Sequence, residues 1–110
     1  MPGYAHRAVL VVPEDEETAA PGGAITTELC GRWEHEPPCR YPHVTEVVAR
    51  DADRVTVRTL FACEPAEVVS VRARISDALD RWTVLDEGPD PGPDSLGEWA
   101  ARHGYPAAPA

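Results

Sequence analysis

The segment from residue 30 to residue 43 (CGRWEHEPPCRYPH) concentrates side chains that bind metals: Cys30, His35, Cys39 and His43. Two thiolates and two imidazoles suit tetrahedral Zn²⁺, with Zn–S and Zn–N distances of about 2.3 and 2.0–2.1 Å. Prolines at positions 37, 38 and 42 forbid a continuous helix, so we expect a rigid loop with turns between successive ligands. We predict that these four side chains coordinate one structural Zn²⁺.

Other interpretations stay open for this segment. Cys30 and Cys39 can instead form a disulfide in a metal-free domain, and Cys63 or His6 can replace one of the four ligands. Three ligands and a water would make an open zinc site, as in a metalloenzyme or a metal-handling protein. The zinc-deaminase pattern H-x-E…P-C-x-x-C is not matched. Four candidate ligands in one short loop favour a closed site, so we expect a binding module rather than an enzyme.

The block from Trp33 to His43 resembles a family of small, uncharacterised zinc-binding proteins from high-GC actinobacteria. The resemblance continues through the chain that follows, to about residue 82. The resemblance implies a metal site and brings no known activity. The composition also indicates a high-GC genome, because the chain has no Lys, Asn or Gln and all 10 of its basic residues are Arg.

Composition and net charge indicate how many domains the chain forms and which partners it can bind. The 110 residues suit one domain, and 19 acidic against 10 basic residues give a net charge of −9. Such a chain repels phosphate backbones, so we expect another protein as its partner and no nucleic acid. No apolar run approaches the roughly 18 residues of a membrane helix, and no signal peptide begins the chain. We therefore expect a cytoplasmic protein without a membrane partner.

The pattern of apolar residues predicts an α+β fold, with a small antiparallel sheet of about three strands and one main helix packed on it. Residues 6–13 are apolar and β-branched, and residues 44–50 and 54–62 flank a short polar turn, as in a hairpin. Residues 83–85 can add a short edge strand. The main helix is expected over residues 64–82, where one apolar stripe recurs at helical spacing: Val68, Val71, Ile75, Leu79 and Trp82.

Two segments are expected outside the core: an acidic loop at 14–23 and a flexible, Pro/Gly-rich tail at 87–110, which leaves 1–86 as one zinc-stabilised domain. About 70 residues then remain to build a core, so we predict that the metal is required for folding. Within the tail, residues 95–103 carry helix start and stop signals around Trp99. Two interpretations stay open for this short segment: it docks on a partner and folds on contact, or it belongs to a disordered tail and carries the helix signals by chance.

Overall fold

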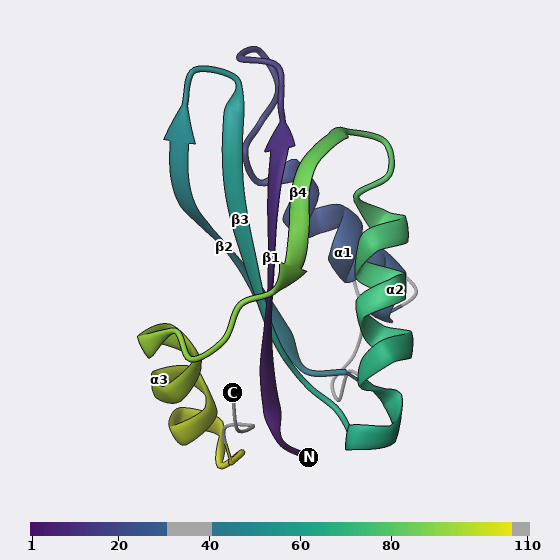
Figure 1. The fold of residues 1–110 in the computed structure, drawn as a ribbon, viewed down its shortest axis with the longest axis vertical. Coiled ribbons are helices and arrows are strands. Elements are labelled where there is room, and N and C mark those ends of the chain that lie inside the picture. The colour runs from purple at the N-terminus through teal and green to yellow at the C-terminus, as the bar shows by residue number, and fades with distance from the viewer. Residues whose placement is uncertain (31–40, 107–110) are drawn as a thin grey trace.

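A computed structural model describes residues 1–30 and 41–106 of the chain. Its elements are β1 (Gly3–Val11), α1 (Ala20–Cys30), β2 (His43–Asp51), β3 (Arg54–Ala62), a 3₁₀ turn η1 (Pro65–Glu67), α2 (Val68–Ala78), β4 (Thr83–Pro89) and α3 (Asp94–His103). The four strands form one antiparallel sheet in the order β2-β3-β1-β4 (Figure 1). Up to β4 this is the split βαβ, or ferredoxin-like, topology. The α+β class is confirmed, and the described residues form four strands and three α-helices where about three strands and one main helix were expected.

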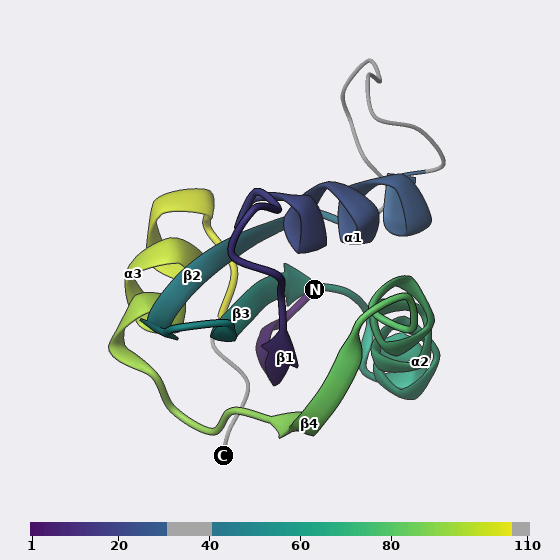
Figure 2. The ribbon, with the colours of Figure 1, turned by 90° about the horizontal axis from the view of Figure 1, so that it is seen from above.

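The main core lies between one face of the sheet and the helices α1 and α2 (Figure 2). The predicted hairpin strand at residues 54–62 is confirmed as β3, in which Val55, Val57 and Phe61 point into this core, opposite Leu10, Ala8 and Tyr4 of β1. The apolar stripe of the predicted main helix is also buried from Val71 to Trp82. The helix itself is shorter than expected, because η1 precedes it and α2 ends at Ala78.

Helix α1 corrects the expectation of a loop at residues 14–23. It begins at Ala20 despite one proline and two glycines in its first four residues. Proline is tolerated in the first turn of a helix, where its missing N–H has no helical partner. Ile25 and Leu29, one turn apart, are buried in the main core. A Cβ at Gly22 would lie 3.3 Å from Cβ of Thr45, so the glycine lets α1 approach β2 closely.

The chain after residue 87 is not a tail separate from the domain. Strand β4 continues to Pro89, and α3 packs on the second face of the sheet through Leu96, Trp99 and Ala100. The Asp90 N–H donates to the Ala5 carbonyl at 3.1 Å, which fixes the connection between β4 and α3. Trp99 is 7% exposed, so it is not displayed for docking on a partner. No helix in the described part of the chain has the length and apolarity needed to cross a membrane.

Candidate metal centre and the pocket beside it

The last turn of α1 brings Cys30 next to His43, the first residue of β2. Cys30 Sγ lies 4.0 Å from His43 Nδ1, although 13 positions separate the two residues. In a tetrahedral zinc site the bond lengths of about 2.3 and 2.05 Å place S and N about 3.6 Å apart. The fold therefore brings together the two predicted ligands that the structure describes.

The His43 ring is held at both nitrogens. Nδ1 lies 2.9 Å from the Tyr41 carbonyl oxygen, which can only accept, so Nδ1 donates and Nε2 accepts from the Thr26 hydroxyl at 3.0 Å. Thr26 precedes Cys30 by one helical turn, which places both side chains on the same face of α1. A hydroxyl also accepts hydrogen bonds, so in the other tautomer Nε2 can donate to Thr26, and Nδ1, the ring nitrogen near Cys30 Sγ, then carries a lone pair.

Side chains of η1 and α2 hold Tyr41, just before β2, in place. Tyr41 is buried, and its hydroxyl donates to Glu67 Oε1 at 3.1 Å. The Arg74 guanidinium lies over the Tyr41 ring, 5.6 Å from its centroid, and donates to the Glu28 carbonyl of α1 at 2.5 Å. The positions of Cys30 and His43 thus depend on packing among α1, α2 and β2.

Two predicted ligands, His35 and Cys39, lie outside the described residues. Cys30 is disulfide-bonded, and Cys63 is free. Among residues 1–30 and 41–106, no three His, Cys, Asp or Glu side chains form a group that can hold a metal ion. Neither Cys63 nor His6 therefore completes a metal site with Cys30 and His43.

Cys63 lies between β3 and η1 and is a free thiol, fully buried in the main core. Burial raises the pKa of this thiol, and the carboxylates of Glu67 and Glu64 raise it further. A thiol with a raised pKa is a poor thiolate ligand. Cys63 acts here as a small apolar side chain.

His6 belongs to a buried polar network that no local pattern in the sequence indicates. Its Nδ1 lies 3.0 Å from Arg72 Nη1, and its Nε2 lies 2.7 Å from Glu87 Oε2. Arginine only donates, so Nδ1 accepts and the Nε2–H donates to Glu87. Burial lowers the pKa of His6 although Glu87 opposes this effect. With both nitrogens bound, His6 joins β1 to α2 and β4 and is not placed to bind a metal.

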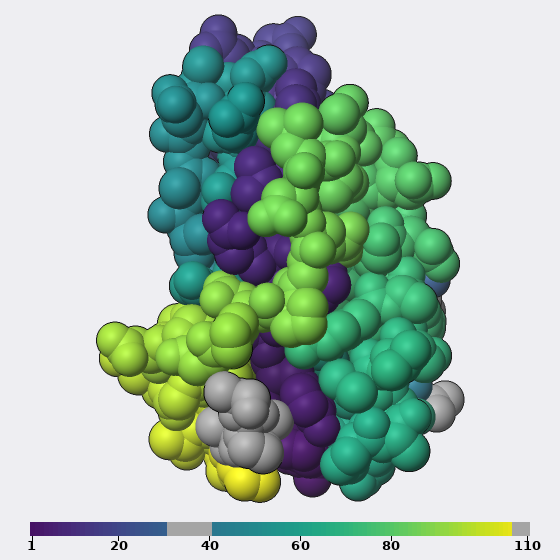
Figure 3. Space-filling view, viewed as in Figure 1, coloured from purple at the N-terminus to yellow at the C-terminus, as the bar shows by residue number. Residues whose placement is uncertain are grey.

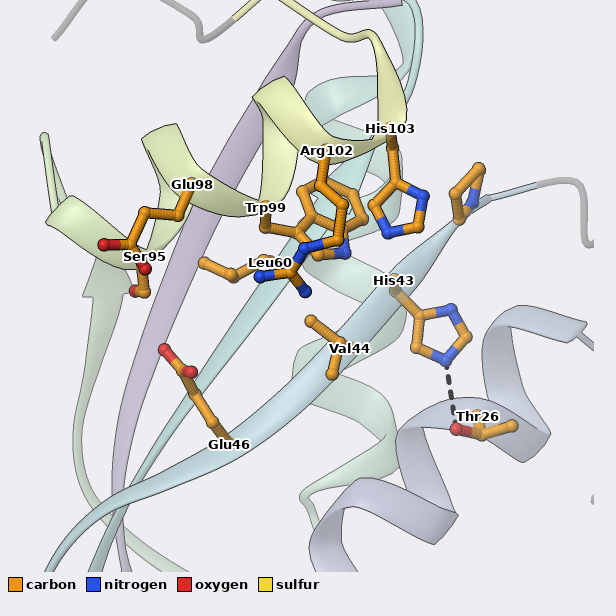
Figure 4. Close-up of a pocket in the computed structure, with 11 residues that line it drawn as sticks. Thr26, His43, Val44, Glu46, Leu60, Ser95, Glu98, Trp99, Arg102 and His103 are labelled. Carbon is orange, nitrogen blue, oxygen red and sulfur yellow. Dashed lines mark hydrogen bonds between the residues drawn. The ribbon is translucent and has the colours of Figure 1, made fainter.

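An open pocket of about 650 Å³ lies between α3 and β2, on the side of His43 away from the main core (Figure 4). Strand β2 contributes His43, Val44 and Glu46, and α3 contributes Trp99 and Arg102, among others. No local pattern in the sequence indicates this pocket, because the residues of α3 follow a Pro/Gly-rich segment that is typical of a separate tail.

No protein-family model, curated protein or solved structure matches this chain. The resemblance to actinobacterial zinc-binding proteins gains no support from these comparisons.

Proposed function

We propose that this chain is a small zinc-binding module in which the metal is structural and which acts by binding another protein. Cys30 and His43 supply two ligands, and His35 and Cys39 the other two. The observation that supports this proposal best is the 4.0 Å approach of Cys30 Sγ to His43 Nδ1. Thr26 adds support, since metal-bound histidines almost always donate their second N–H to a neighbouring acceptor.

A metal held by Cys30 and His43 would connect the end of α1 to the start of β2. In the split βαβ topology these two elements lie on either side of the segment that carries the other two ligands. A closed site with four protein ligands leaves no position for a substrate or a water. The proposed role of the ion is therefore to hold this junction in place, and the free energy of metal binding adds to the free energy of folding.

A second candidate is the metal-free domain with a Cys30–Cys39 disulfide. The observation that favours it is that Cys30 is disulfide-bonded in the structure. A disulfide sulfur is not a thiolate, and only the thiolate is a good zinc ligand. Cys30 therefore cannot be a zinc ligand and part of a disulfide in the same molecule. Counting zinc and thiols in one preparation distinguishes the two forms.

The test uses the full chain, produced without a metal-binding tag and purified without chelator or reductant. Zinc is measured by mass spectrometry, and thiols are counted after denaturation with EDTA. The chain has 3 cysteines, so the zinc form gives about one zinc and three thiols per chain, whereas the disulfide form gives no zinc and one thiol. His43→Gln should lower the zinc content, and His103→Gln, at an exposed histidine, should not. One thiol and no zinc would overturn the zinc proposal.

A further inference from the structure

The pocket between α3 and β2 combines an apolar floor with basic side chains at one end. Leu60 and Trp99 are nearly buried and line the floor, and Val44 beside them is 40% exposed. In Figure 4, Arg102 extends from α3 toward β2, and the His103 ring points into the same space. A pocket with an apolar lining and a few convergent polar groups is the usual form of a small-molecule site.

Arg102 has no carboxylate partner among the described residues. Glu98 precedes it by one turn on α3, the spacing at which Glu and Arg commonly form an ion pair, yet no ion pair joins them. Figure 4 shows Glu98 on the side of Ser95, away from the Arg102 guanidinium. Glu46, the other carboxylate of the pocket, lies 3.3 Å from Arg58 Nη1 and is paired there. Both carboxylates that line the pocket, Glu46 and Glu98, are thus directed away from Arg102, and its guanidinium faces the pocket without an anion from the described residues.

The His103 ring is held at the basic end by its aromatic neighbours. Its centroid lies 5.3 Å from that of Trp99 and 6.3 Å from that of Tyr105, with the Tyr105 ring nearly parallel. Tyr105 follows the left-handed Gly104 that ends α3, and its N–H donates to the Ala100 carbonyl at 2.8 Å. Because these contacts orient the ring before any ligand arrives, His103 loses little side-chain freedom on binding.

We propose that this pocket binds a small apolar carboxylate. The guanidinium of Arg102 takes the carboxylate group, because its planar fork matches two oxygens at once. The His103 ring donates a further hydrogen bond, and the apolar body of the ligand lies on Val44, Leu60 and Trp99. His43, one of the proposed zinc ligands, also lines this pocket. The groups proposed to bind the carboxylate, Arg102 and His103, are not among the proposed zinc ligands.

The test is an NMR titration of the ¹⁵N-labelled full chain with phenylbutyrate and, in parallel, with the uncharged phenylbutanol. Phenylbutyrate should give saturable shifts at the amides of Val44, Leu60 and Ser95, and bind about tenfold more tightly than the alcohol. Arg102→Gln should remove most of this difference, and Arg102→Lys should keep part of it. Arg54→Gln, which makes the same charge change outside the pocket, should leave the affinity unaltered.

Equal affinities for the acid and the alcohol in the wild-type protein, or shifts that do not saturate, would overturn the proposal. An equal loss of affinity in Arg102→Gln and Arg54→Gln would do the same, because it would indicate a general effect of charge. If Arg102→Gln disturbs α3, the comparison of acid with alcohol in the wild-type protein still decides the question.

Discussion

At the scale of single residues, Thr26 is the side chain that holds the His43 ring at Nε2 beside Cys30. We predict that Thr26→Val lowers the affinity for Zn²⁺ about tenfold, because Nε2–H loses its acceptor and the ring is no longer held. Competition with a chromophoric chelator measures this affinity. Thr27→Val is the matched control, since the Thr27 hydroxyl donates to the Gly23 carbonyl and is exposed. Equal affinities for the two variants would show that Thr26 does not orient a metal ligand.

His6 gives the second prediction, on the pH dependence of stability. Burial lowers the pKa of His6 in the folded protein from the ordinary 6.5. The unfolded chain then binds a proton more readily than the folded one, so acid favours unfolding. The stabilisation is complete above pH 6.5 and is lost as the pH falls through the lower folded pKa.

The measurement for His6 is the free energy of unfolding in urea at several pH values between about 7.5 and 5. The wild-type protein should lose stability over this range. In His6→Asn the loss should be smaller, because the buried titrating group is gone, whereas His103→Gln should follow the wild type. A slope that is the same in His6→Asn and in the wild type would mean that another group titrates.

At the scale of elements, α3 is stabilised by its contact with the sheet. A Cβ at Gly3 would lie 3.3 Å from Leu96 Cδ1, so the glycine permits the close approach of β1 and α3. Beyond the helix, the Gly3 N–H donates to the Pro106 carbonyl at 2.7 Å. Arg58 Nε, in β3, donates to Asp90 Oδ2 at 2.6 Å, and this hydrogen bond holds the segment before α3 against the sheet. That hydrogen bond raises the pKa of Arg58, which stays charged.

The third prediction concerns Trp99, the largest side chain in this contact. We expect Trp99→Ala to lower the free energy of unfolding by about 3 kcal/mol, because it removes a nearly buried indole from the cluster with Ala5 and Leu60. Urea unfolding followed by far-UV circular dichroism measures this. Glu98→Ala, on the exposed side of the same helix, should change the stability by less than about 0.5 kcal/mol. Similar values for the two variants would show that α3 does not depend on its packing.

At the scale of the whole molecule, one sheet carries two hydrophobic clusters. The main core on one face includes Ala8 and Leu10, and the smaller cluster on the other face includes Ala5 and Leu60. Helix α3 covers only part of this second face, and β1 is visible between β3 and β4 in Figure 3. Together α1 and α3 enlarge the core beyond the roughly 70 residues expected from sequence. This reduces the free energy that a metal would have to contribute to folding.

The sequence alone predicted the elements whose pattern is local. An apolar, β-branched run predicted β1, and two segments that flank a polar turn predicted the hairpin of β2 and β3. The helical spacing of Val71 and Ile75 predicted the buried face of α2. These patterns need only neighbours within a few positions, because strand and helix periods are set by the backbone. The sequence also identified Cys30 and His43 as candidate ligands.

Only the tertiary structure decided which distant residues meet. Helix α1 forms over a Pro-Gly-Gly sequence because burial of Ile25 and Leu29 outweighs low helix propensity. The contact of His6 with Glu87 spans 81 positions and depends on β4 pairing with β1. The pocket at Arg102 exists because α3 packs on the sheet near β2. Such contacts arise from the packing of whole elements, and no local pattern of residues encodes them.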